Sequence, residues 1–336
     1  MYTVAIVGAT GAVGAELLRV LESRSFPIKT LVPLASARSV GQSVTFAGRE
    51  IPVQAAGPES FKGVDFAFFS AGATRSRELA PAALEAGAIV IDNSSAFRTD
   101  PTIPLIVPEV NADALGPEHR LVANPNCVAA IMAVACAPIE KIRRITRLVV
   151  STYQSASGAG ARAMEDLLVQ TRDVLAGKDP IPAVLPHPYA FNLFSHNAAM
   201  EENGYNGEEN KVVFEMRKIM ERPDLRLSVT CVRVPVLRAH SMSLNIECDT
   251  DDIAADLPAI REALATAEGV RLVDDAVANH YPMPNEASGA DDVLVGRLRA
   301  DPSNPAALNL FIAGDQLLKG AALNAVQIAE LIASRT

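Results

Sequence analysis

The chain has 336 residues, of which 49% are apolar, and a formal net charge of −9 at pH 7. This length and composition predict two folded domains, and the acidic balance excludes the basic face that nucleic acids and anionic membranes attract. The longest apolar run, residues 128–139, is too short to span a bilayer. No basic and apolar leader precedes the first predicted strand, so we expect a cytoplasmic protein.

The first 125 residues alternate short β-rich runs with helical patterns. Such alternation predicts an α/β fold of the Rossmann type, with a doubly wound parallel sheet. The expected strands lie at residues 2–7, 29–36, 64–70 and 88–94, and the expected helices at 12–23 and 78–87.

The pattern changes from about residue 145. Longer strands are expected there, one of them alternating as an antiparallel strand does, which predicts a second α+β domain with a mixed sheet. An amphipathic C-terminal helix is expected to return to the first domain. The expected strands lie at 144–154, 227–237 and 241–250, a helix at 161–175, a loop rich in Pro, His and Asn at 179–210, and a helix from about residue 210.

The sequence GATGAVG directly follows the first predicted strand and opens the first predicted helix. Gly8, Gly11 and Gly14 remove side chains where a pyrophosphate would approach the backbone, and the helix N-terminus supplies N–H donors. The G-x-x-G-x-x-G spacing is looser than the usual dinucleotide fingerprint, so a turn that only packs helix on sheet is the alternative. With a strand before it and a helix after it, we expect nucleotide binding.

The second predicted strand ends in Ser36-Ala37-Arg38-Ser39 and carries no carboxylate. An NAD site normally has an acidic residue there for the ribose 2′-hydroxyl. A guanidinium flanked by two hydroxyls instead suits a 2′-phosphate. We therefore predict NADP rather than NAD, the alternative being a solvated surface arginine.

The stretch VANPNCVAAI places Cys127 after an Asn-Pro-Asn corner and at the head of an apolar run. Most cysteines are inert core residues. If a helix begins at Cys127, however, its free N–H groups and dipole favour a thiolate, and the residue becomes a candidate nucleophile. The other cysteines, at positions 136, 231 and 248, show no C-x-x-C spacing, so neither a metal site nor a disulfide framework is expected.

A cysteine nucleophile needs a proton partner. His119, His187, His196 and His280 lie in loop-like surroundings rich in Pro or Asn. His240 instead ends the strand-like run RVPVLRAHS, where a fixed imidazole could face a cleft. A structural histidine is the alternative, but its pairing with a candidate nucleophile favours His240 as the acid/base.

Several further stretches make the pattern specific. They are LASARSVGQ, IDNSSAFR, LIVPEVN, NPNC, VSTYQSASGAG, FEMRKIM, CVRVPV followed by AHS, VGRLR and LLKGAALNAVQIAE. With GATGAVG, they show that the chain resembles the bacterial aspartate-β-semialdehyde dehydrogenase family over almost its whole length. The resemblance implies an NADP-binding domain at 1–126, completed by a helix at 315–336, and a catalytic and dimerisation domain at 127–314.

The resemblance also assigns roles to single residues. It implies that Cys127 is the acyl-thioester nucleophile, that His240 is the acid/base and that Gln154 contacts the substrate and orients this pair. Arg98 and Lys218 would bind the substrate phosphate, Glu215 its α-ammonium and Arg233 its α-carboxylate. The implied cofactor contacts are Gly8, Thr10, Gly11, Ala12, Val13, Ser36, Arg38, Ser39, Gly72, Ser157, Gly158 and Gln316.

The implied reaction is the NADPH-dependent conversion of aspartyl phosphate into aspartate semialdehyde and phosphate. Cys127 attacks the β-carbonyl, phosphate leaves, the thioester accepts a hydride, and His240 protonates the collapsing thiohemiacetal oxygen. The resemblance also implies a homodimer formed through the second domain, with small molecules and neither nucleic acid nor membrane as partners.

Three positions depart from the family pattern. Val128-Ala129-Ala130 replaces residues that are often Ser or Thr, Met242 stands where many members have Glu, and Gln316 stands where Asn is usual. These departures keep open a non-catalytic relative that only binds NADP. N-acetyl-γ-glutamyl-phosphate reductase is a further alternative, but its substrate has no α-ammonium for Glu215 to bind.

Overall fold

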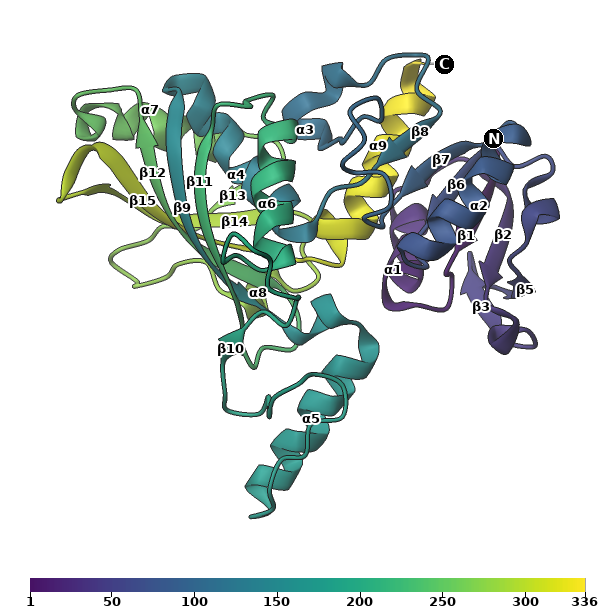
Figure 1. Ribbon diagram of the computed structural model, residues 1–336. Coiled ribbons are helices and arrows are strands. Elements are labelled where there is room, and N and C mark those ends of the chain that lie inside the picture. Colours follow the sequence, from purple (N-terminus) through teal and green to yellow (C-terminus); the bar gives the residue numbers. More distant parts are fainter. Residues whose placement is uncertain (336) are drawn as a thin grey trace. The chain divides into compact units, whose positions relative to one another are not determined.

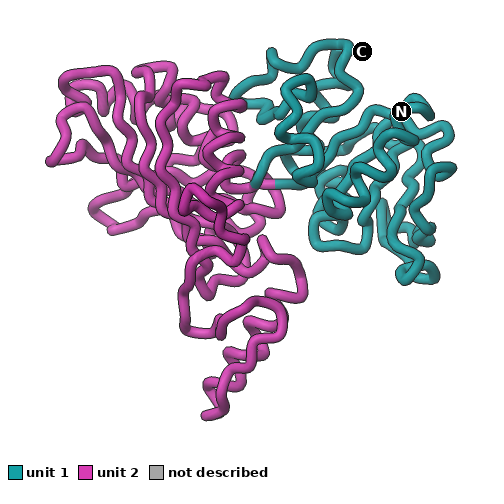
Figure 2. Tube along the Cα trace, viewed as in Figure 1, with its two compact units in different colours: residues 1–126, 321–336 teal, residues 127–320 magenta. Residues whose placement is uncertain are grey.

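The computed structural model describes residues 1–335, which form two compact units (Figure 2). The first unit contains residues 1–126 and the chain from residue 321 onward, and the second contains residues 127–320. The chain thus returns to the first unit later than the boundary at residue 315 expected from the sequence. No helix among residues 1–335 has the length and apolar character that crossing a membrane requires.

The first unit is built on a six-stranded sheet in the order β5-β2-β1-β6-β7-β8, and every pair in it is parallel. The predicted doubly wound sheet is therefore confirmed. Its strands are β1 (Tyr2–Val7), β2 (Ile28–Ala35), β5 (Gln54–Ala55), β6 (Phe66–Phe69), β7 (Ile89–Asp92) and β8 (Leu121–Ala123), and β3 (Ser43–Phe46) and β4 (Arg49–Pro52) form a separate hairpin.

Apolar runs explain why these strands form the centre of the unit. All four residues of β6 are buried, as expected of a strand covered on both faces. The C-terminal helix belongs to this unit, because α9 contacts α1, α3 and β7, and Arg24 pairs with Glu330 at 2.8 Å. The helices of the unit are α1 (Ala12–Ser23), α2 (Ala73–Glu85), α3 (Pro108–Asn111) and α9 (Leu323–Arg335).

The second unit is built on a mixed seven-stranded sheet in the order β10-β11-β9-β12-β15-β14-β13 (Figure 1). The pairs β9–β11 and β13–β14 are parallel and the others are antiparallel. The predicted mixed sheet is confirmed. The strands are β9 (Ile145–Gln154), β10 (Phe194–Ser195), β11 (Arg226–Arg233), β12 (His240–Cys248), β13 (Val270–Leu272), β14 (Val293–Asp301) and β15 (Asn304–Gly314).

The two faces of this sheet differ in how they are covered. Val150, Leu244 and Leu310 lie side by side in neighbouring strands and are buried on the face against which α4 packs. One residue further along, Ser243 is exposed and Phe311 only half-buried, so the opposite face is left open. The helices of the unit are α4 (Cys127–Ile142), α5 (Ala161–Leu175), α6 (Gly207–Ile219), α7 (Ile253–Thr266) and α8 (Pro284–Ala287).

Three element boundaries differ clearly from the sequence prediction. The helix expected at 78–87 begins five residues earlier, at Ala73. The strand expected to reach residue 237 ends at Arg233, because Pro235 has no N–H for a ladder. The helix expected from residue 315 begins with a π-helical turn, Leu318–Ala322, and continues as α9. The cause is Asp315, whose carboxylate accepts from the N–H of Leu317 at 2.9 Å and so forms a turn before the helix.

Candidate active site

The glycine-rich loop between β1 and α1 is tightly packed. Gly8 has φ +98°, and a Cβ there would lie 2.9 Å from the backbone of Ser70. A Cβ at Gly14 would collide with the carbonyl oxygen of Gly8. These two glycines are therefore required by helix–strand packing, which the sequence analysis had set as the alternative to nucleotide binding.

The N-terminus of α1 is nevertheless suited to a phosphate. Its N-cap residue, Gly11, is exposed and supplies no side-chain cap, and the first turn of the helix carries no acidic residue. The first N–H groups of a helix need acceptors, and a pyrophosphate provides them. The loop residues Thr10 to Val13 thus fit the group that the sequence predicts for them.

Two more predicted cofactor segments follow the strands on either side of β1. Arg38 and Ser39 lie in a single 3₁₀ turn after β2, and the hydroxyls of Thr10 and Ser39 are 3.4 Å apart. Gly72 is the N-cap of α2, just after β6, with φ +86°. All three segments therefore lie at the carboxyl edge of the sheet, where parallel sheets bind nucleotides. Arg38 is exposed, as a residue that meets a ligand phosphate should be.

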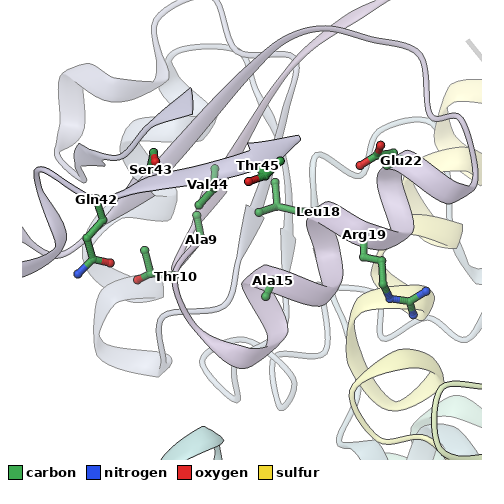
Figure 3. A pocket seen from close by; sticks show the side chains of 10 residues that line it. All are labelled: Ala9, Thr10, Ala15, Leu18, Arg19, Glu22, Gln42, Ser43, Val44 and Thr45. Atoms are coloured by element: carbon green, nitrogen blue, oxygen red, sulfur yellow. The ribbon is translucent and has the colours of Figure 1, made fainter. Parts of the chain in front are cut away.

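A groove of about 430 Å³ runs beside the phosphate loop, between α1 and β3 (Figure 3). Thr10 and Gln42 lie at one end of it, and Arg19 and Glu22 at the other. Because it follows the flank of α1 beyond the first turn, this groove is a different feature from the phosphate-binding end of the helix.

The predicted nucleophile, Cys127, is the first residue of the sixteen-residue helix α4 and is half-buried. It therefore lies where the helix dipole favours a thiolate. The residues that follow it, Val128 to Ala130, are fully buried. Their apolar side chains belong to the core, which explains the absence of hydroxyls in this turn.

Gly320 supports the backbone of the nucleophile. A Cβ at this position would lie 2.6 Å from Cβ of Cys127 and 3.3 Å from Cβ of Gln316. Only glycine therefore lets the π-helical turn approach Cys127 so closely. No pattern in the sequence marks Gly320 as a site residue, although π-helical turns often mark functional sites.

The predicted acid/base, His240, is the first residue of β12 and is completely buried. Its Nδ1 lies 3.0 Å from both the N–H and the hydroxyl of Ser155. Its Nε2 has no hydrogen-bond partner within residues 1–335. Burial, followed by the nearby charge of Arg233, lowers the pKa of the imidazole well below its usual value, so the ring is neutral.

Gly158 lies directly against the imidazole of His240. A Cβ there would lie 3.0 Å from Nε2 of His240 and 3.4 Å from Nη1 of Arg233. The φ of Gly158 is not in the left-handed region, so the backbone alone does not require glycine. Nε2 of His240 and Nη1 of Arg233 therefore both lie close to Gly158, and a side chain at this position would collide with the imidazole.

The turn that carries Gly158 is held by Gln316. The side chain of Gln316 accepts from the N–H of Ala239 at 2.9 Å and donates to the hydroxyl of Ser157. Gln316 thus joins the segment 316–320, which packs on Cys127, to Ala239 just before His240 and to the turn that carries Ser157. The oxygen and the nitrogen of its amide group therefore both make hydrogen bonds, although its side chain is one methylene longer than that of the usual asparagine.

The remaining predicted substrate residues of the second unit lie on α6 and at adjacent strand ends. Arg233 ends β11 and pairs in register with Gln154, the last residue of β9. Glu215 is buried and Lys218 is half-buried, one helical turn apart on α6. Arg98 belongs to the first unit, where it donates to the carbonyls of Asn93 and Asn124, at 2.8 Å each.

Met242 lies on the same face of β12 as His240, as the strand period predicts. It is fully buried between Thr152 and Ile312 in the neighbouring strands. A carboxylate there would need a compensating partner, whereas a methionine packs without one. Methionine in place of the family's glutamate therefore suits the buried position of residue 242.

His196 is a site residue that the sequence analysis placed only in a loop. Its Nε2 lies 2.7 Å from Nη2 of Arg233, and its own N–H donates to the carbonyl of Cys231 at 2.8 Å. The short strand β10 lies within the predicted loop and places residues 194–195 beside β11. This pairing brings His196 to Arg233.

Comparison with known proteins defines the class first. The family model described as the NAD binding domain of semialdehyde dehydrogenase matches residues 3–117, and the model described as its dimerisation domain matches residues 136–319. The chain belongs to the semialdehyde dehydrogenase family. The resemblance stated from the sequence is confirmed.

Among individual relatives, the chain is similar to aspartate-semialdehyde dehydrogenases. The enzyme of Synechocystis is 52% identical over 332 residues, covering 99% of this chain and 97% of that protein. The enzyme of Bacillus subtilis is 47% identical, covering 97% and 96%. The solved structure of aspartate semialdehyde dehydrogenase II from Vibrio cholerae, complexed with ASA, has a TM-score of 0.95 at 41% identity and covers 99% of this chain and 98% of that chain.

Proposed function

We propose that the chain is an aspartate-semialdehyde dehydrogenase. It uses NADPH to convert L-aspartyl 4-phosphate into L-aspartate 4-semialdehyde and phosphate. The observation that carries this proposal is the link between Cys127 at the start of α4 and Nε2 of His240, which has no hydrogen-bond partner within residues 1–335. The link is made through Gly320, Gln316 and the Ser155–Gly158 turn. The near-full-length similarity to aspartate-semialdehyde dehydrogenases supports it.

The first chemical step is acyl transfer. The Cys127 thiolate attacks the β-carbonyl carbon, the C–S bond forms, the C–O bond to phosphate breaks, and phosphate leaves with a proton taken up from the site. The N-terminus of α4 stabilises the thiolate before attack. The thioester that remains is a better hydride acceptor than a carboxylate, because sulfur donates less electron density to the carbonyl.

The second step is reduction and release. NADPH, when bound, supplies a hydride to the acyl carbon. Negative charge then develops on the former carbonyl oxygen, and Nε2 of His240, beside Gly158, donates a hydrogen bond to it and then its proton. Collapse restores the carbonyl, breaks the C–S bond and returns the thiolate. His240 thus serves the proton-donating role inferred from the sequence.

Each charged group of the substrate is held by a side chain of the opposite charge. Arg233 binds the α-carboxylate, Glu215 the α-ammonium, and Arg98 with Lys218 the phosphate. Gln154, buried at the end of β9 and in register with Arg233, contacts the substrate. The buried carboxyl group of Glu215 favours a free α-amino group over an N-acetylated one, and so argues against N-acetyl-γ-glutamyl phosphate as substrate.

The cofactor is NADP. The uncapped start of α1 and Gly72 fit the pyrophosphate and its surroundings, and Arg38 with Ser36 and Ser39 fits the 2′-phosphate. Ser157 and Gly158 contact the nicotinamide portion. In this assignment residues 1–126 with the C-terminal helix bind the cofactor, and residues 127–320 carry catalysis and dimerisation. Such a biosynthetic enzyme works in the cytoplasm.

The active form is a homodimer in which a second copy covers the open sheet face of residues 127–320. A small apolar hollow on that face is lined by Tyr153, Val236 and Phe311, among others. The family model for this part of the chain is described as a dimerisation domain. Exposed apolar side chains also cluster on α5 and the chain that follows it, at Val169, Leu175, Ile181, Phe191, Leu193 and Met200.

One assay tests the function and its alternatives together. Phosphate-dependent reduction of NADP is measured with L-aspartate 4-semialdehyde and, separately, with N-acetyl-L-glutamate 5-semialdehyde. Turnover with the first aldehyde and not with the second is expected. Preference for the acetylated aldehyde would favour the reductase alternative, and no turnover with either, despite NADPH binding, would favour a non-catalytic relative.

A further inference from the structure

Arg233 is held by neutral groups on three sides. Its Nη1 donates to the carbonyl of Ser155 at 3.3 Å, its Nε to the amide oxygen of Asn197 at 3.4 Å, and its Nη2 faces Nε2 of His196 at 2.7 Å. Arg233 is only 4% exposed. Because these acceptors carry no negative charge, they orient the cation without neutralising it.

The contact with His196 is the shortest of the three and fixes the charge state of the imidazole. A guanidinium can only donate, so Nε2 must accept. Nδ1 also faces an N–H, that of Ala198 at 3.2 Å. An imidazolium would present N–H groups to both of these donors. The surroundings therefore favour the neutral ring, and burial followed by the charge of Arg233 accordingly lowers the pKa of His196 to about 4.

The imidazole is itself anchored in the fold. The strand β10 pairs with β11 so that Phe194 lies opposite Arg233, and the main-chain N–H of His196 donates to Cys231. The ring of Phe194 packs against those of His187 and Tyr189, at 5.2 and 5.5 Å between centroids. His196 thus meets Arg233 from a segment held by a strand pairing and by aromatic packing.

We propose that His196 is a positioning residue for Arg233, which holds the guanidinium with an uncharged acceptor so that no carboxylate in direct contact competes with the α-carboxylate of the substrate. This role rests on the proposed function. The imidazole supplies a hydrogen-bond acceptor without a charge, so it fixes the orientation of Nη2 while Nη1 stays beside Gly158. A carboxylate at position 196 would fix the same orientation but would compete with the substrate.

The test uses two nearly isosteric variants that differ in charge, His196→Gln and His196→Glu, together with His196→Ala. We expect KM for L-aspartate 4-semialdehyde to change within about threefold in His196→Gln, to rise roughly tenfold in His196→Ala, and to rise furthest in His196→Glu. The turnover number kcat should change much less than KM in all three. A purely structural role for the side chain instead predicts that Gln and Glu behave alike and that Ala is worst.

A second substrate isolates the carboxylate. With 3-aminopropanal, which lacks the α-carboxylate, the KM differences between wild type, His196→Gln and His196→Glu should disappear. Equal KM values for the Gln and Glu variants with the full substrate, or the same differences with 3-aminopropanal, would overturn the proposal. If His196→Ala does not fold, the Gln and Glu pair still decides it. Failure of the proposed function would be recognised separately, because the wild-type protein would then not turn over L-aspartate 4-semialdehyde.

Discussion

Ser155 meets Nδ1 of His240 with both a donor and an acceptor: its main-chain N–H and its hydroxyl each lie 3.0 Å from that nitrogen. The N–H favours the tautomer that carries its proton on Nε2, which can donate to a developing oxyanion. The hydroxyl can instead accept from Nδ1 when the ring takes up a second proton. One residue can thus support both protonation states that an acid/base passes through.

The absence of a side chain at Gly158 is required for turnover. In Gly158→Ala, the added methyl group would lie 3.0 Å from Nε2 of His240 and 3.4 Å from Nη1 of Arg233. We expect kcat/KM to fall by roughly 100-fold, since a misplacement of about 1 Å in a site has this effect. Steady-state kinetics measure this, and an unchanged thermal unfolding midpoint would show that the fold is intact.

Gly160→Ala is the matched control for that variant. Gly160 has φ +93° and open space at its Cβ position, so the substitution strains the backbone without filling the site. We expect a loss of about 1 kcal/mol in the free energy of unfolding, with kcat/KM per folded molecule close to wild type. A greater loss of kcat/KM in Gly160→Ala than in Gly158→Ala would refute the explanation.

Gly320→Ala should displace the nucleophile. The added methyl group would approach Cβ of Cys127 to 2.6 Å, so either the π-helical turn or the start of α4 must move. We expect turnover to fall by at least about 100-fold and the alkylation rate of Cys127 by iodoacetamide to change. Wild-type alkylation and turnover in this variant would show that the close approach has no functional consequence.

Arg38 should select NADP over NAD. Charge-assisted hydrogen bonds to a 2′-phosphate contribute about 1.5–3 kcal/mol, so Arg38→Ala should raise KM for NADPH roughly 10- to 100-fold. KM for NADH should stay the same, because NADH has no 2′-phosphate. Arg49→Ala, at an exposed arginine of the same unit, is the control. Equal effects on both cofactors would remove Arg38 from cofactor selection.

Buried neutral histidines make stability depend on pH. The pKa of His196 is lowered to about 4, by burial first and then by Arg233 and Lys211, against the opposing charges of Glu208 and Glu209. In an unfolded chain it is about 6.5. Between these values the unfolded state binds the proton and the folded state does not, so the free energy of unfolding falls as pH falls from about 6.5 to 4. Above about pH 6.5 the imidazole is neutral in both states, so this loss of stability is absent.

Chemical denaturation at several pH values measures this effect. His196→Gln has no such titration, so its stability should fall less steeply between pH 6.5 and 4, by up to roughly 1.4 kcal/mol per pH unit. His240, whose pKa is lowered in the same direction, is present in both proteins and cancels in the comparison. Parallel stability curves for the two proteins would contradict a neutral buried imidazole at position 196.

The sequence predicted the elements whose causes are local. The β-rich runs became β1, β2, β6 and β7, and the helix at 161–175 has the predicted bounds. Cys127 as the head of a helix followed from a pattern within ten residues of it. His240, expected to end a strand-like run, instead begins β12, because β11 already ends at Arg233 before Pro235. Local patterns could not give the point where the C-terminal helix begins, because it depends on the turn formed by Asp315.

Other features escaped prediction because they depend on contacts between distant segments. Gly320 resembles any glycine in a helical stretch until α4 is packed against it, and His196 resembles any loop histidine until β10 pairs with β11. Gln154, Ser155 and Arg233 meet at the ends of two parallel neighbours, β9 and β11. The family resemblance predicted the roles of several residues, but not which side chains support them.

The most direct measurement compares catalysis with cofactor binding in Cys127→Ala. Phosphate-dependent NADP reduction with L-aspartate 4-semialdehyde should fall by at least about a thousandfold, because no acyl–enzyme bond can form. The dissociation constant for NADPH, measured by fluorescence titration, should stay within about twofold of wild type. Turnover near the wild-type rate in this variant would contradict a thioester mechanism at residue 127.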